Sequence, residues 1–103
     1  MPFPSYRSPT HTSVSVSNTT STTVLAANLN NVRYRNFRNP RGNSATIWLA
    51  LTSAAAVGGP ALIDLAPGEY YEMSERLGNL FDGQVNAIND GSANQSLLVT
   101  EGL

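Results

Sequence analysis

The sequence contains no cysteine and no lysine, and it has one histidine, His11. Without cysteine, neither a disulfide nor a thiolate metal site can stabilise the chain. With one histidine, a transition-metal site would depend mainly on carboxylates, which are a weak donor set for such ions. A serine nucleophile would have only His11 as an imidazole base. We therefore expect no metal, no cofactor and no enzymatic activity.

Long apolar runs are also missing. No stretch approaches the ~18 apolar residues needed to span a bilayer, and residues 1–9 contain no apolar run of signal-peptide length. A phosphate-binding loop is not indicated either, because Gly58-Gly59 is followed by Pro60, which has no N–H to donate. We expect neither export nor contact with a membrane.

Charge is scarce and unevenly distributed. Charged residues make up 13% of the chain, whereas about a quarter is usual. Residues 1–63 contain five arginines and no acid, while residues 64–103 contain all seven acids and one arginine. Arginine is enriched at protein interfaces and lysine is depleted there. The exclusive use of arginine therefore favours contacts with other proteins.

Strand patterns recur along the chain. Residues 13–17 alternate polar and apolar side chains, which is the period of a strand with one buried face. Ala66-Pro67-Gly68-Glu69 fits a type II turn, with proline second and glycine third. Residues 52–57 are rich in alanine but too few for a stable helix, and 74–83 has room for at most one helical turn. The expected strands are 13–17, 21–25, 32–37, 45–51, 61–65, 69–73, 85–88 and 95–100.

Seven or eight short strands at spacings of about ten residues predict an all-β protein, an antiparallel β-sandwich or jelly roll. We assign residues 13–103 to this one domain. The most apolar strand, 45–51, belongs at the centre of a sheet. Trp48 lies on the opposite face from Ile47 and Leu49, either in a second part of the core or at a subunit contact.

Residues 1–12 contain three prolines and no periodic apolar pattern. We interpret them as an extended N-terminal arm. A solvated terminus is the simpler interpretation, but Phe3 and Tyr6 would serve as anchors on a partner. These two residues and Arg7 are therefore candidate contacts.

A cluster of arginines and aromatic residues follows within nine residues: Arg33, Tyr34, Arg35, Phe37, Arg38 and Arg41. The arginines could be solvated or paired within the chain, or they could meet acidic residues of a neighbouring subunit. They could also neutralise phosphates while the aromatic residues stack on bases. The slightly acidic net charge of −1 disfavours nucleic acid. Our candidate partner-binding residues here are Arg33, Arg35, Arg38 and Arg41.

Three glutamates, Glu69, Glu72 and Glu75, recur beside Tyr70 and Tyr71. Two facing carboxylates could act as acid and base. On a strand, however, Glu69 and Glu72 fall on opposite faces, so we expect a solvated or interfacial edge instead of a catalytic pair.

The segments 21–28, 33–40, 45–50, 65–72, 86–88 and 98–102, with the Leu-Ala-Pro-Gly turn and the terminal Thr-Glu-Gly, together resemble small β-sandwich virion proteins of tailed bacteriophages. The resemblance implies a decoration or cement protein that binds the assembled capsid and stabilises it. Its partners would be the major capsid protein and other copies of itself, as a dimer or trimer. It would be made in the host cytoplasm and end on the capsid surface. The alternative is a fibre, tail or neck module that binds a host-surface receptor or another virion protein, with Tyr70, Tyr71 and residues 76–84 as its site.

Overall fold

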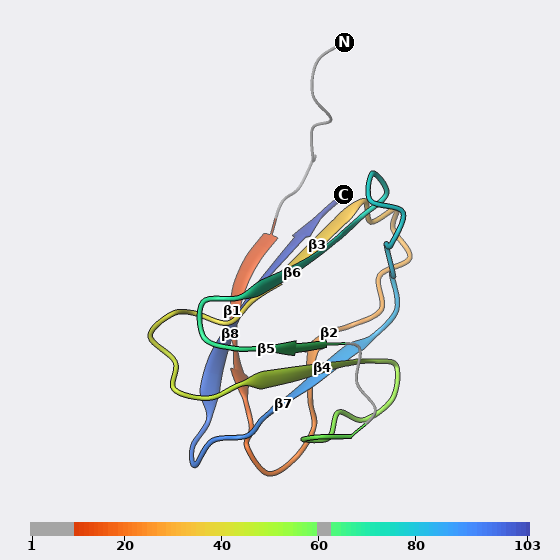
Figure 1. Cartoon of the computed structure of the whole chain (residues 1–103). Helices are drawn as coiled ribbons and strands as arrows, with labels where there is room; N and C mark the ends of the chain where they lie inside the picture. The colour runs from red at the N-terminus through yellow and green to blue at the C-terminus, as the bar shows by residue number, and fades with distance from the viewer. Residues whose placement is uncertain (1–9, 60–62) are drawn as a thin grey trace.

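The computed structural model describes residues 10–59 and 63–103. Within these ranges the chain forms eight strands and no helix, which confirms the predicted all-β class (Figure 1). None of the described residues form a helix that could cross a membrane. The strands are β1 (Thr10–Val16), β2 (Thr22–Leu25), β3 (Tyr34–Arg38), β4 (Ile47–Leu51), β5 (Ile63–Leu65), β6 (Tyr70–Ser74), β7 (Val85–Asn89) and β8 (Gln95–Gly102).

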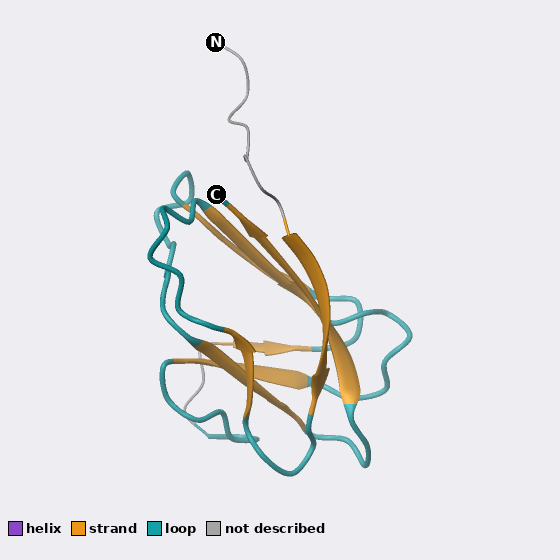
Figure 2. Cartoon of the chain, turned by 180° about the vertical axis from the view of Figure 1, so that it is seen from behind, coloured by secondary structure: helices purple, strands orange, loops and turns teal. Residues whose placement is uncertain are grey.

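The strands form two antiparallel sheets of four, which lie over each other as two layers (Figure 2). The strand orders are β1-β8-β3-β6 and β2-β7-β4-β5. The first four strands pair with the last four in reverse order, β1 with β8, β2 with β7, β3 with β6 and β4 with β5. This is the pairing of one long hairpin, and the further pairs β3·β8 and β4·β7 fold that hairpin into two layers. The architecture is therefore a jelly roll.

The first strand begins earlier than the sequence pattern predicts. Thr10 pairs with Glu101, and the ladder continues to Val16. Residues 10–12 therefore pair in the sheet, and the first strand begins at Thr10 instead of the predicted residue 13. Residues 10–12 contain no proline, so each of them has a main-chain N–H and can pair in a sheet. Residues 1–9 lie outside the described part of the chain, and so do the candidate contacts Phe3, Tyr6 and Arg7.

The core lies between the sheets and follows the two-residue period of the strands. On β3 the inward side chains are Arg35 and Phe37, both fully buried, whereas Tyr34 and Arg38 point outward. Burial of each large apolar side chain contributes roughly 1.5–3 kcal/mol. The core cluster contains Val16, Val24, Phe37, Ile47, Leu49, Leu65, Met73, Val85, Ala87, Leu97 and Val99.

A second, smaller apolar cluster covers the outer face of the sheet β2-β7-β4-β5. Trp48 packs there against Ala50, Ala55 and Ile88. Strand β4 thus has apolar neighbours on both faces, and Trp48 is partly buried in this second cluster. Ala55 comes from the β4–β5 connection, and its N–H donates to the Ser21 hydroxyl at 2.9 Å.

The predicted type II turn is present. The N–H of Glu69 donates to the carbonyl of Ala66 at 2.9 Å, and Gly68 has φ of 92°. Only glycine adopts this conformation without strain. The turn joins β5 of one sheet to β6 of the other.

Candidate binding surface

The four clustered arginines do not form one surface. Arg35 is fully buried between the sheets, whereas Arg33, Arg38 and Arg41 are exposed. Arg35 shares its strand face with Phe37, so the burial of that ring carries Arg35 inward. The prediction of Arg35 as a partner contact is therefore wrong.

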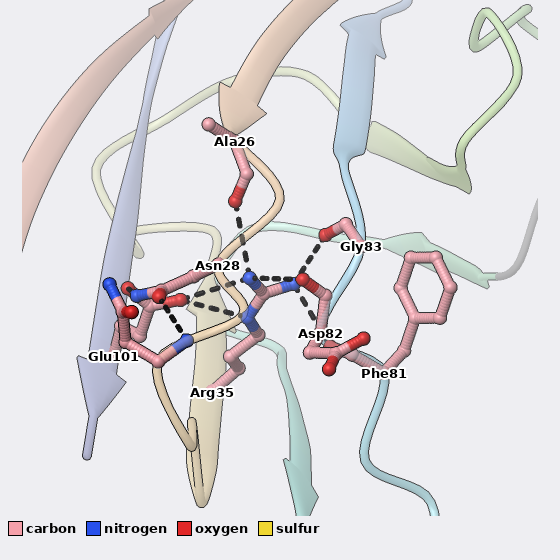
Figure 3. Close-up of polar contacts among 8 residues, drawn as sticks. Ala26, Asn28, Arg35, Phe81, Asp82, Gly83 and Glu101 are labelled. Atoms are coloured by element: carbon pink, nitrogen blue, oxygen red, sulfur yellow. Dashed lines mark hydrogen bonds and ion pairs between the residues drawn. The ribbon is translucent and has the colours of Figure 1, made fainter.

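The guanidinium of Arg35 donates hydrogen bonds from all five of its N–H groups (Figure 3). Its Nε donates to Glu101 Oε2 at 3.0 Å, and Nη2 lies 2.9 Å from the same oxygen. The other four bonds go to main-chain carbonyls. Nη1 contacts Phe81 O at 2.9 Å and Gly83 O at 2.6 Å, and Nη2 contacts Ala26 O and Asp82 O, each at 3.2 Å.

These carbonyls belong to the two connections that cross between the sheets, β2–β3 and β6–β7. The crossings lie side by side, because Asn28 N donates to Asp82 O at 2.8 Å. Asn28 Nδ2 also donates to Glu101 Oε1 at 2.9 Å. Arg35 therefore joins both crossings to β8, and its role is structural.

Arg33 lies at the end of the sandwich where residues 1–9 join the domain. There β1 begins and β8 ends, since Thr10 pairs with Glu101, and Arg33 N donates to Gly102 O at 2.9 Å. The Arg33 side chain forms an exposed ion pair with Glu75 at 3.1 Å. Such pairs contribute little to stability, so both partners can exchange to another protein.

Two leucines are exposed in the crossings at this end. Leu29 is 82% exposed in the β2–β3 connection, and Leu77 is 56% exposed in the β6–β7 connection. We call the surface formed by Thr10, Leu29, Arg33 and Leu77 the arm end. Sequence reasoning missed Leu29, which lies among polar residues, whereas Leu77 lies within residues 76–84, the segment named for the alternative receptor-binding site.

A groove with a volume of about 860 Å³ lies on the outer face of the sheet β1-β8-β3-β6. We call it the outer groove. Strand β3 contributes its three outward side chains, Tyr34, Asn36 and Arg38. Strands β1, β8 and β6 contribute the remaining lining residues, which are His11, Thr12, Ser13, Leu98, Val99, Thr100, Gly102 and Glu72.

The polar groups of the outer groove are only partly satisfied within the chain. His11 Nδ1 lies 3.0 Å from Thr100 Oγ1, and the Tyr34 hydroxyl lies 3.5 Å from Glu72 Oε1. The side chains of Asn36 and Arg38 make no hydrogen bond or ion pair with any described residue. The groove therefore offers an amide that can donate and accept and a guanidinium that can donate.

The other residues that the sequence analysis singled out, the glutamates, the two tyrosines and Arg41, do not come together in one site. Glu69 lies in the β5–β6 turn, where its Oε1 accepts from Ala66 N at 2.8 Å, and Glu72 lines the outer groove. Tyr70 is 63% exposed, whereas Tyr71 packs against the core. Arg41 lies near Gly68, beyond the far end of β3. Among the described residues, no group of three His, Asp or Glu side chains could hold a metal ion.

Comparisons with protein-family models, curated proteins and solved structures find no match. The geometry alone thus defines the class: a single jelly-roll domain with two surfaces suited to binding, the arm end and the outer groove.

Proposed function

We propose that this chain is a structural protein of a bacteriophage particle that binds the assembled capsid and stabilises it, as a decoration or cement protein does. The observation that carries the proposal is the arm end. It brings the exposed Leu29 and Leu77 and the loosely paired Arg33 to the place where residues 1–9 join the domain. Jelly rolls are common among virion proteins, and the sequence resembles small phage virion proteins.

The stabilisation would act by mass action. A protein that binds the assembled shell and not the free subunit shifts the equilibrium toward the shell. A contact of about 800 Å² per partner is normal for specific binding. Apolar contact by the two leucines and exchange of Arg33 from Glu75 to an acidic residue of the shell would supply both affinity and orientation.

Co-sedimentation with purified shells tests this proposal. The full chain should pellet with assembled shells and stay in solution with free capsid subunits. The double variant Leu29→Asp/Leu77→Asp should bind about tenfold or more weakly, because it places two charges in the apolar contact. Leu98→Asp makes the same chemical change in the outer groove, where Leu98 is 42% exposed, and should bind normally. A native chain that stays in solution with assembled shells would refute the proposal, and equal binding of all three proteins would refute the arm end as the contact surface.

A second candidate function is favoured by the outer groove. A fibre, tail or neck module could bind a neutral host-surface saccharide there, because Asn36 and Arg38 have no partner among the described residues and saccharide hydroxyls both donate and accept. Arg38 and Glu72 together give the groove no net charge.

Amide chemical shifts of the full chain, recorded during titration with maltotriose, cellotriose and chitotriose, test this second candidate. Binding should shift the amides of β3 and β8 and should weaken about tenfold in Asn36→Ala. Arg41→Ala removes an exposed polar side chain outside the groove and is the control. Absence of shifts with all three saccharides would remove this candidate and leave the first one standing.

A further inference from the structure

Each sheet has two edge strands, and three of the four carry features that prevent pairing with another chain. Exposed edges are normally protected by shortness, by irregular register or by charge. Strand β2 has four residues and a register shift between Thr23 and Leu25. Strand β5 has three residues with the exposed Asp64 at its centre, and β6 has Glu72 at its centre.

Strand β1 has none of these features. It has seven residues, Thr10–Val16, with no charged residue, proline or glycine and no register shift against β8. It pairs with β8 only. The Val16 carbonyl accepts from Asn89 Nδ2 at 2.8 Å, whereas the main chain of residues 10–15 makes no hydrogen bond with any described segment other than β8.

Self-pairing distinguishes β1 further. An antiparallel pair related by a two-fold axis places the central residue of the strand opposite or next to its own copy. For β5 and β6 this would bring Asp64 to Asp64, or Glu72 to Glu72, and like charges repel. For β1 it brings Ser13 near the partner's Ser13, and the nearby Thr12 and Ser15 also carry small hydroxyl side chains, which pair well across strands.

We propose that β1 pairs antiparallel with β1 of a second copy and joins the two four-stranded sheets into one sheet of eight strands. The pairing is isologous and closes as a dimer. Directly opposed residues of antiparallel strands share a face, so Ser13 lies opposite the partner's Ser13 or the partner's His11. The outer grooves of the two copies then lie on the same face of the joined sheet, and the two arm ends point in opposite directions.

Sedimentation equilibrium of the full chain tests this inference. The native chain should show a concentration-dependent mass that rises to twice the 11.0 kDa of one chain. Ser13→Lys alone and Ser13→Asp alone should each dissociate about tenfold more readily, because two like charges meet across the strands. An equimolar mixture of the two variants should regain the dimer, since opposite charges then meet. Circular dichroism would verify that each variant remains folded.

Ser96→Lys is the matched control. Ser96 is exposed on the outer face of β8, directly opposite Ser15, but it is not on an edge strand. This variant should dimerise like the native chain. A native chain that stays monomeric up to ~1 mM, or a dimer that both Ser13 variants leave intact, would overturn the inference. The inference rests on the strand edge alone, so loss of shell binding would not affect it.

Discussion

Replacement of Arg35 by methionine should lower the stability of the domain more than any exposed arginine replacement. Arg35 is fully buried, and the Glu101 side chain beside it is 14% exposed. Removal of one partner of a buried ion pair costs about 3–5 kcal/mol. Four main-chain carbonyls lose their donor at the same time. We expect a loss of about 4 kcal/mol, which is a large part of the ~5–15 kcal/mol that stabilises a typical domain.

Urea unfolding monitored by the fluorescence of Trp48, the single tryptophan, measures this loss. The double variant Arg35→Met/Glu101→Leu should regain roughly half of it, because the carboxylate is no longer buried without a partner while the carbonyls remain without donors. Arg33→Met is the matched control, because its ion pair with Glu75 is exposed. It should cost at most about 1 kcal/mol.

The reasoning would be refuted if Arg35→Met and Arg33→Met lowered the unfolding free energy equally. That result would mean that the two crossings hold together without the guanidinium. Full recovery in the double variant would instead mean that the four carbonyls find water or other donors once the side chain is gone.

Two further predictions concern other buried or constrained positions. Gly68→Ala should lower the unfolding free energy by about 1–2 kcal/mol, because Gly68 has a φ of 92°, which strains a residue with a Cβ. An added Cβ would meet no atom closer than 3.9 Å, so backbone strain is the only cost. Gly42→Ala should be neutral, since Gly42 has no positive φ and open space around it, and both are measured by urea unfolding. Asn39→Leu should lower the unfolding free energy by about 2–4 kcal/mol, because Asn39 is fully buried and its Nδ2 donates to the carbonyls of Ala45 and Leu65 at 2.9 and 2.8 Å. Thermal unfolding measures this loss, and an unchanged melting temperature would contradict the prediction.

Most of the fold follows from the sequence because its signals are local. All eight strands lie where period-two alternation and turn residues predict them, and the turn at Gly68 has the predicted conformation. The errors are at strand ends. Strand β1 begins at Thr10 and β8 continues to Gly102, since pairing with a neighbouring strand extends each ladder beyond its apolar pattern. Strand order also needs the structure, because pairing joins residues about ninety positions apart.

The candidate site was harder to predict, and Arg35 shows why. The arginines lie close together in the sequence and were therefore predicted to form one surface. Alternate residues of a strand, however, face opposite sides of the sheet, and this decides which arginine side chains reach the solvent. Arg35 is two residues from Phe37 and therefore shares its strand face, which the sequence alone could have used to place Arg35 between the sheets. The partners of Arg35 could not have been found this way, because they are main-chain carbonyls of irregular segments. The outer groove was missed for a similar reason: Arg38 and Leu98 become neighbours only through the β3·β8 pairing.

An averaged image of the phage particle that carries this chain tests the proposed function most directly. We predict a two-layered density of this size on the outer surface of the shell, with the arm end, marked by Leu29, Arg33 and Leu77, against the capsid protein. An image with the domain at a fibre tip, or with the arm end pointing away from the shell, would contradict the proposal.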